Sequence, residues 1–253
     1  MDFFVREDSI VRKIWGKSDT VLFIFAGAAA EFALNKAVDW LYFTGRLPAD
    51  PIGRLFSTVT YARRIVFSER EQALRAIDKI TSIHSGVEQA RGAKIPDWAY
   101  RDVLFMLIHY SIASFELLER KLSAVEKEEV YNVFKRLGDR MGLNELPADY
   151  VSWLPVRERH MADDLEKSKY TVDLFLQYRK NLGGPRYKIL KQAQILVIPP
   201  RVQQLLGFSR YSWLSPAVPV YKFIRGINLD WLVKSILLPS AYKKEIRELD
   251  VVP

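Results

Sequence analysis

The 253-residue chain contains no cysteine. This absence excludes disulfide bonds, thiolate ligation of haem, iron–sulfur clusters and cysteine-based structural zinc sites. Histidine is scarce as well, with three residues in the chain. Any imidazole chemistry must therefore come from His84, His109 or His160.

A long hydrophobic run is also missing. The best candidate extends from Val21 to Ala30 and ends at Glu31, whereas a membrane-spanning helix needs about 20 apolar residues. We interpret this run as a buried core helix. The first residues are acidic where a secretion signal would be basic and then apolar. We expect a cytoplasmic protein, with peripheral contact to a membrane left open.

Dense blocks of one charge are absent too, although the net charge is +8, from 38 Lys+Arg against 30 Asp+Glu. The basic residues are dispersed, and no nucleic-acid-binding motif is present. Gly-rich phosphate loops, nucleophile elbows and paired-histidine protease signatures are missing as well. We interpret the charge as a solvated surface and expect no nucleic-acid partner.

Hydrophobic residues make up 49% of the chain, with 14 Phe, 12 Tyr and 6 Trp. So many aromatic side chains can fill a large core, and they can also line an apolar pocket. Helical spacing dominates from residue 18 to about 206, and alternating strand patterns are scarce. The sequence predicts an all-α fold, with a single compact multi-helix domain over residues 1–208.

Residues 209–253 form a different kind of segment, an irregular tail broken by prolines at 216, 219 and 239. The tail is aromatic and basic, with Trp213, Tyr221, Phe223, Arg225 and Trp231. We expect it to wrap the core. The alternative is that it lies on a membrane or a partner.

Capping signals divide the domain into helices. Asp50-Pro51 offers an N-cap acceptor and a proline at the first helical position, which predicts a helix to about Phe67. Ser68 and Glu71 have capping-box spacing and predict a helix from there to about Arg91, ended by Gly92. The spacing predicts further helices over 97–121, from a Ser123–Glu126 capping box to 138–142, and over 148–167, 171–180, 187–197 and 201–206.

The three histidines differ in their surroundings. His84 follows Ile77 and Ile80 at steps of seven and four and precedes Val87 by three, so it faces the interior of its helix. An interior histidine is either a hydrogen-bonded core residue or a ligand. His109 lies two turns before Glu116, which favours a structural relation. His160 lies in a charged stretch, and we expect it to be exposed.

The preceding helix carries a mixed stripe, because Arg54, Thr58, Tyr61 and Ile65 follow at steps of four, three and four. A guanidinium, a hydroxyl and a phenol beside an isoleucine suit a polar corner of an apolar cavity. The same stripe would also mark the boundary between a buried and a solvated face.

Three segments carry a family resemblance: Ala49-Asp50-Pro51-Ile52-Gly53-Arg54-Leu55-Phe56-Ser57-Thr58, Ile65-Val66-Phe67 and Ile83-His84-Ser85-Gly86-Val87. Weaker landmarks are Ala26-Gly27, Ser114-Phe115, Arg140-Met141-Gly142-Leu143, Pro200-Arg201-Val202 and Leu206-Gly207. In order and spacing these residues resemble the catalytic domain shared by the oxygenase MpaB and latex-clearing rubber oxygenases. The resemblance covers about residues 9 to 240.

The resemblance implies an all-α fold that binds haem b. By the same resemblance, His84 matches the proximal iron ligand, and Arg54 and Thr58 match polar residues on the opposite, oxygen-binding side. The implied activity is that of an oxygenase or oxidase that uses molecular oxygen on an apolar, isoprenoid- or lipid-like small molecule. Ser57 stands where latex-clearing members have lysine, which argues against polymer cleavage.

A second hypothesis is non-enzymatic. The early helix reads Asn35-Lys36-Ala37-Val38-Asp39, without the histidine that many relatives carry there. A helical protein with a degenerate haem site could bind an apolar ligand, a membrane surface or a partner. The basic, aromatic tail fits this alternative.

Overall fold

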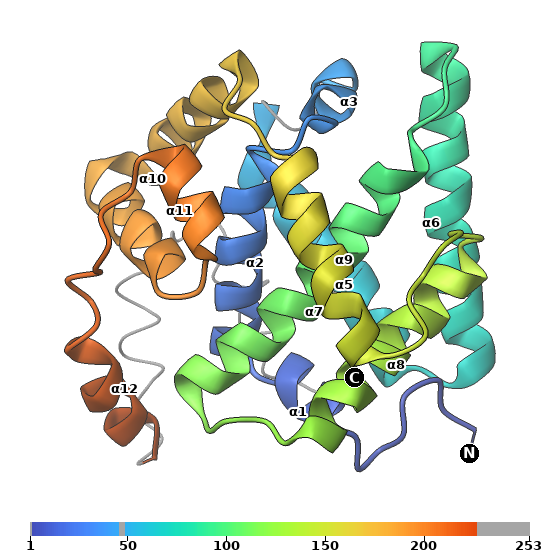
Figure 1. Ribbon diagram of the computed structural model, residues 1–253, viewed down its shortest axis with the longest axis horizontal. Helices are drawn as coiled ribbons and strands as arrows, with labels where there is room; N and C mark the ends of the chain where they lie inside the picture. The colour runs from blue at the N-terminus through green and yellow to red at the C-terminus, as the bar shows by residue number, and fades with distance from the viewer. Residues whose placement is uncertain (1, 46–48, 227–253) are drawn as a thin grey trace.

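The computed structural model describes residues 2–45 and 49–226 and is 75% helical (Figure 1). The predicted all-α class is confirmed. Within the described residues, β-type pairing is limited to two isolated bridges. The helices in chain order are α1 (Ile10–Trp15), α2 (Ser18–Phe32), α3 (Val38–Phe43), α5 (Pro51–Phe67), α6 (Arg70–Arg91), α7 (Asp97–Leu118), α8 (Ala124–Arg140), α9 (Tyr150–Asp163), α10 (Lys169–Ile195), α11 (Pro200–Leu206) and α12 (Ala217–Gly226).

Helices α2 and α7 form the centre of the molecule and pack against each other more extensively than any other pair of described helices. Helix α5 packs on the next helix, α6, which stands at one edge of the molecule, and α10 to α12 lie at the opposite edge (Figure 1). The main core contains large, fully buried aromatic side chains, namely Trp15, Phe105, Tyr110, Tyr131 and Trp153.

The close approach of α2 and α7 depends on Gly27. A Cβ atom at this position would lie 2.3 Å from ring atoms of Tyr110. Because Gly27 has no side chain, the Tyr110 ring can lie directly against α2. The Tyr110 hydroxyl donates a hydrogen bond to Glu31 at 2.8 Å. The apolar run noted in the sequence is therefore a buried core helix, as predicted. Among the described residues, no helix is long and apolar enough to span a membrane.

Several predicted helix ends are confirmed. Asp50 accepts a hydrogen bond from the Gly53 amide at 2.8 Å and Pro51 opens α5. Gly92 ends α6 with φ of 69°, in the left-handed region that glycine tolerates. Ser123 and Glu126 form the expected capping box of α8.

The predicted capping box at Ser68 is wrong. Helix α6 begins at Arg70, one residue after its N-cap Glu69, and Ser68 instead ends α5 with its amide on the Arg64 carbonyl. The N-terminal segment takes the place of the cap, because the amide of Arg70 donates to the Asp2 carbonyl at 2.8 Å. The two six-residue helices α1 and α3 were not predicted from the sequence.

Other helix bounds differ by a few residues from those predicted. Helix α7 ends at Leu118, and α9 keeps Pro155 inside its length. The predicted break at Gly183 is a kink in α10, where φ is 74° and ψ is 163°. The helical segments on its two sides correspond to the two predicted helices.

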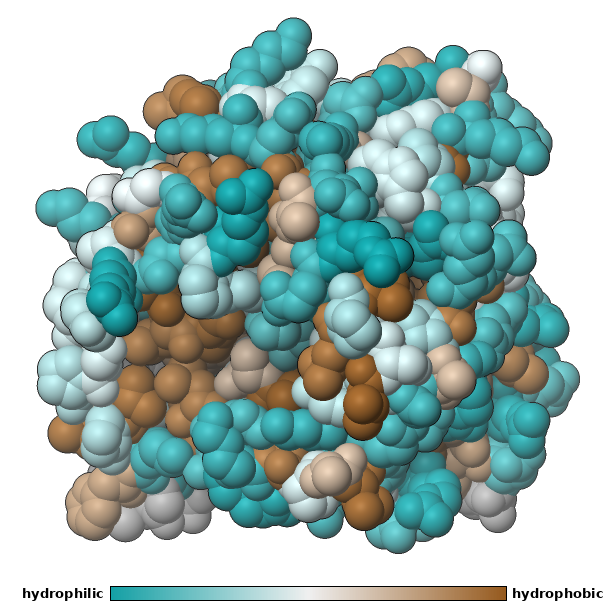
Figure 2. All heavy atoms as spheres, viewed as in Figure 1, coloured by the Kyte–Doolittle hydropathy of each residue, from teal (hydrophilic) through white to brown (hydrophobic). Residues whose placement is uncertain are grey.

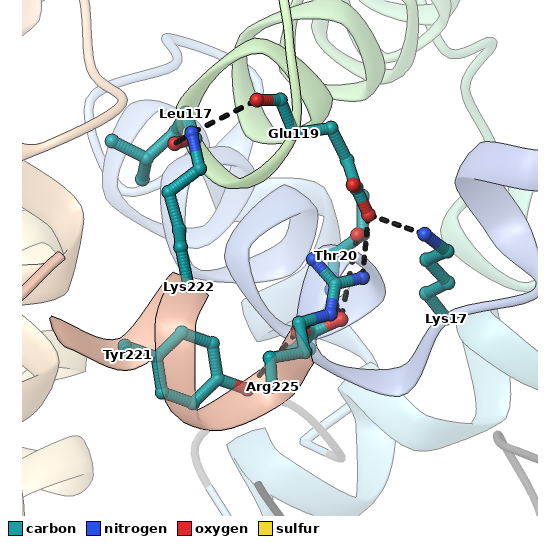
Figure 3. Close-up of polar contacts among 8 residues, drawn as sticks. Lys17, Thr20, Leu117, Glu119, Tyr221, Lys222 and Arg225 are labelled. Atoms are coloured by element: carbon teal, nitrogen blue, oxygen red, sulfur yellow. Dashed lines mark hydrogen bonds and ion pairs between the residues drawn. The ribbon is translucent and has the colours of Figure 1, made fainter. Parts of the chain in front are cut away.

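Helix α12 is fastened to α2 and α7 by polar contacts (Figure 3). Arg225 pairs with Asp19 at 3.0 Å and with Glu119 at 2.7 Å. The Tyr221 hydroxyl also donates to Asp19, and Lys222 donates to the Glu119 carbonyl at 2.9 Å. The later tail residues that we singled out, Trp231 and Pro239, lie outside the described residues.

The face shown in Figure 2 has a hollow with an apolar floor, between the α10–α11 end of the molecule and α12. Large apolar side chains are also exposed in the segment that runs from α11 into α12. These are Tyr211, Trp213, Val220 and Phe223.

Candidate functional site

The three residues proposed from the sequence lie on two helices that pack together. Arg54 and Thr58 are in α5, and His84 is in the second half of α6. All three are partly buried. Ile77, in line with His84, is fully buried, which is consistent with the predicted inward face of α6.

The imidazole of His84 has a buried nitrogen without a partner. Its Nδ1 atom makes no hydrogen bond. The ring lies against Tyr100 of α7, with 5.1 Å between the ring centroids and a tilt of 53°. An unpaired polar atom in the interior costs roughly 1–3 kcal/mol, so this nitrogen is a natural point of attachment for a ligand.

Tyr100 is held in place by Glu88, which lies one turn after His84 on α6. The Glu88 carboxylate accepts hydrogen bonds from the Tyr100 hydroxyl at 3.1 Å and from the Ile95 amide at 2.9 Å. Neither Tyr100 nor Glu88 was predicted from the sequence to belong to the site. The step of four from His84 to Glu88 was the available signal, since it puts both on one face.

Electrostatics link Arg54 to His84 across the two helices. Burial lowers the pKa of His84, the positive charge of Arg54 lowers it further, and Glu88 partly opposes both. The imidazole is therefore neutral at pH 7, which is the form that binds metal ions.

Thr58 and Ser57 are tied to their own helix. The Thr58 hydroxyl donates to the Arg54 carbonyl at 3.2 Å, and the Ser57 hydroxyl donates to the same carbonyl at 2.7 Å. Arg54 Nη1 donates to Ser57 Oγ at 3.4 Å. Thr58 can still accept a hydrogen bond, because its donated proton leaves the oxygen lone pairs free.

A second cluster of polar side chains, formed by Glu31, Tyr110 and Arg157, lies inside the helical core. Arg157 of α9 donates to Glu31 of α2 at 2.5 Å, and both side chains are almost fully buried. Tyr110 donates to the same carboxylate. Burial alone would lower the pKa of Arg157, but Glu31 raises it above its ordinary value. Glu31 Oε1 and Arg157 Nη1 have no hydrogen-bond partner.

The prediction that His160 is exposed is wrong. The residue is buried, and its Nδ1 lies 2.7 Å from Asp164 Oδ2 and 3.4 Å from Asp102 Oδ1. Its ring packs edge-on against Phe105. The charged stretch misled the prediction because Arg157 and His160, three residues apart, both turn inward.

His109 and Glu116, which we expected to be structurally related, each have other partners among the described residues. Glu116 pairs with Lys121 at 2.8 Å and with Lys127 at 3.1 Å. His109 lies near the buried pair instead. Burial and then the charge of Arg157 lower its pKa to about 4, while Glu31 and a hydrogen bond with the Val197 backbone oppose the shift.

The chain was compared with models of known protein families. The family model described as "ER-bound oxygenase mpaB/B'/Rubber oxygenase, catalytic domain" matches residues 12–228, which include both polar groups. The chain belongs to this family. No curated protein and no solved structure gives a significant match. Membership in the mpaB/rubber oxygenase family makes the domain an oxygenase catalytic domain, as the resemblance suggested.

Proposed function

We propose that this member of the mpaB/rubber oxygenase family is a haem b-dependent oxygenase or oxidase in which His84 is the iron ligand. The observation that supports the proposal is the buried, unpartnered Nδ1 of His84. The alternative interpretation of the sequence is a hydrogen-bonded core histidine, and most buried polar atoms of such residues have a hydrogen-bond partner.

The surroundings of His84 fit a haem ligand. The ring is neutral at pH 7, since burial and Arg54 lower its pKa. Tyr100 and Glu88 restrict its position from one side. Neutral imidazole is a common axial ligand of haem iron, and fixed orientation of such a ligand favours binding.

Arg54 and Thr58 are the residues that we assign to the oxygen-binding side. Haem, when bound, supplies the chemistry of oxygen activation. The guanidinium of Arg54 would stabilise negative charge that develops on reduced oxygen. The Thr58 hydroxyl already donates to the Arg54 carbonyl, so it fixes the start of α5 and can accept a hydrogen bond from a bound group.

We infer that the substrate is an apolar small molecule of isoprenoid- or lipid-like chemistry, which molecular oxygen attacks. The aromatic-rich composition supports this class of substrate. Ser57, where latex-clearing members have lysine, argues against a polymer. A protein of this kind would work in the cytoplasm or at the surface of a membrane.

The electronic absorption spectrum of the purified full-length chain tests the proposal. We expect a Soret band that saturates at one haem per chain, either as isolated or after haem is supplied. The ferrous protein should then change its spectrum on exposure to oxygen. No Soret band after haem supplementation would contradict the proposal and would favour the non-enzymatic hypothesis, in which the fold binds an apolar ligand, a membrane or a partner.

A further inference from the structure

Asp102, His160 and Asp164 bring three ligand-type atoms together in a cluster that does not include His84, Tyr100 or Glu88. Asp102 comes from α7, His160 from the last turn of α9, and Asp164 is the residue that caps α9. One imidazole nitrogen and two carboxylate oxygens from these residues lie within 4.8 Å of one another. Donors around one tetrahedral ion at about 2.0–2.2 Å lie roughly 3.3–3.6 Å apart. The 3.4 Å between His160 Nδ1 and Asp102 Oδ1 has this spacing.

The Asp102 carboxylate is buried and only half satisfied. Asp102 is 1% exposed, and its Oδ1 atom, which points toward His160 Nδ1, has no hydrogen-bond partner. The other oxygen, Oδ2, accepts from the Asn35 side chain. Asn35 therefore fixes the carboxylate so that its unpaired oxygen points into the cluster, as residues behind metal ligands commonly do.

The backbone around Asp164 is also held in place. The Lys36 amide donates to the Asp164 carbonyl at 3.0 Å, and the Glu166 amide donates to the Leu34 carbonyl at 2.8 Å. These bonds form an isolated bridge between Asn35 and Leu165. The end of α9 is thereby fastened beside α2, and its carboxylate is presented to His160 without a mobile loop.

Two carboxyl groups share this cluster with the imidazole. The two guanidinium groups nearby have other partners, because Arg157 pairs with Glu31 and Arg101 pairs with Glu145. Buried charges are costly unless they are paired or coordinate a metal ion. A divalent cation would neutralise the cluster and occupy the unpaired Asp102 oxygen.

We propose that Asp102, His160 and Asp164 form a binding site for a divalent transition-metal cation, separate from the haem site that we assign to His84. One imidazole and two carboxylates suit Zn²⁺ with a water in the fourth position, whereas Mg²⁺ prefers oxygen ligands alone. The site joins α7 to the end of α9, so the bound cation would hold these two helices together.

Zn²⁺ binding by the full-length chain, stripped of metal with a chelator, tests the site. Titration against a chromophoric zinc chelator should give one Zn²⁺ per chain, with no competition from a large excess of Mg²⁺. Asp164→Asn keeps the shape of the side chain and should weaken binding at least tenfold, as should His160→Gln. Asp163→Asn, at the exposed neighbouring residue, is the matched control and should bind like the parent.

His84→Ala separates this site from the proposed haem site and should bind Zn²⁺ as tightly as the parent. Zinc should also raise the Tm of the parent, of Asp163→Asn and of His84→Ala, but not that of Asp164→Asn. Absence of stoichiometric binding in the parent would overturn the proposal. So would unchanged affinity in Asp164→Asn, or loss of binding in His84→Ala. If Asp164→Asn does not fold, Zn²⁺ binding by the parent and by His84→Ala decides. Stoichiometric binding by both supports the site, and its absence from either overturns the proposal.

Discussion

Arg54 and His84 lie on consecutive packed helices, and the positive charge of Arg54 lowers the pKa of the His84 imidazole. The helices α5 and α6 thus bring a fixed guanidinium to a neutral imidazole that has one buried, unpartnered nitrogen. A cation near a neutral imidazole favours its metal-binding form, because protonation would place two positive charges together. This relationship is the physical basis of the proposed haem site.

Arg54→Ala should raise the pKa of His84 in the haem-free protein. The value should stay below that of histidine in water, because burial, the larger cause of the shift, remains. An NMR titration of the His84 ring protons measures the change. Arg64→Ala, at an exposed position of the same helix, is the control and should leave the pKa unchanged. An unaltered pKa in Arg54→Ala would remove the electrostatic link between the two residues.

Glu31→Gln should destabilise the protein strongly, because it leaves the buried Arg157 charge without its counter-ion. Loss of one partner from a buried pair typically costs about 3–5 kcal/mol of unfolding free energy. Glu71→Gln removes a partner of Arg75 in an exposed ion pair and should cost less than about 1 kcal/mol. Urea unfolding of both variants provides the comparison. Equal losses would show that Arg157 does not depend on Glu31.

Local features of the fold could be predicted from the sequence, and contacts between distant segments could not. Asp50 and Gly92 were interpreted correctly because a cap acceptor and a left-handed glycine act within one helical turn. Ser68 was misread because Asp2, from the other end of the domain, supplies the acceptor for Arg70. Nothing in the local sequence indicates that contact.

His109 should make the protein less stable in acid. Its folded pKa is about 4, below the ordinary value of 6.5, so the unfolded chain takes up a proton first as the pH falls. Neutral His109 therefore contributes to the free energy of unfolding above about pH 6.5. This contribution, on the order of 3 kcal/mol in total, is lost as the pH falls through 6.5 toward 4.

Unfolding by urea at pH 7 and at pH 4.5 measures this effect. His109→Gln lacks the titrating ring, so its stability should fall less between the two pH values than that of the parent. Other titrating groups are shared by both proteins and cancel in the difference. The assignment fails if the parent and the variant lose the same free energy.

Arg225→Ala should loosen α12 from the core. The side chain is 15% exposed and pairs with both Asp19 and Glu119, and such partly buried, charge-assisted contacts contribute about 1–3 kcal/mol. Hydrogen exchange of the amides in residues 217–226 should accelerate in the variant. Arg210→Ala, which removes an exposed guanidinium before α12, should leave exchange there unchanged. Unchanged protection in Arg225→Ala would show that apolar packing alone holds the helix.

The candidate site shows the same division between local and long-range information. The Arg54–Thr58 and Ile77–His84 stripes follow from helical periodicity. The sequence did not reveal that Tyr100 lies against His84, because a long-range contact between α6 and α7 brings them together. His160 was misread for the same reason, and Arg157 was not singled out. Their partners Glu31 and Asp102 come from α2 and α7, and charged residues are rarely buried without such partners.

The haem stoichiometry of His84→Ala tests the central claim most directly. Haem titration followed at the Soret band should saturate at one haem per chain in the parent and in Ser85→Ala, an exposed neighbour on α6. His84→Ala should bind no stoichiometric haem while its far-UV circular dichroism remains helical, because apolar burial holds the fold. Full haem occupancy with an unchanged spectrum in His84→Ala would contradict the account.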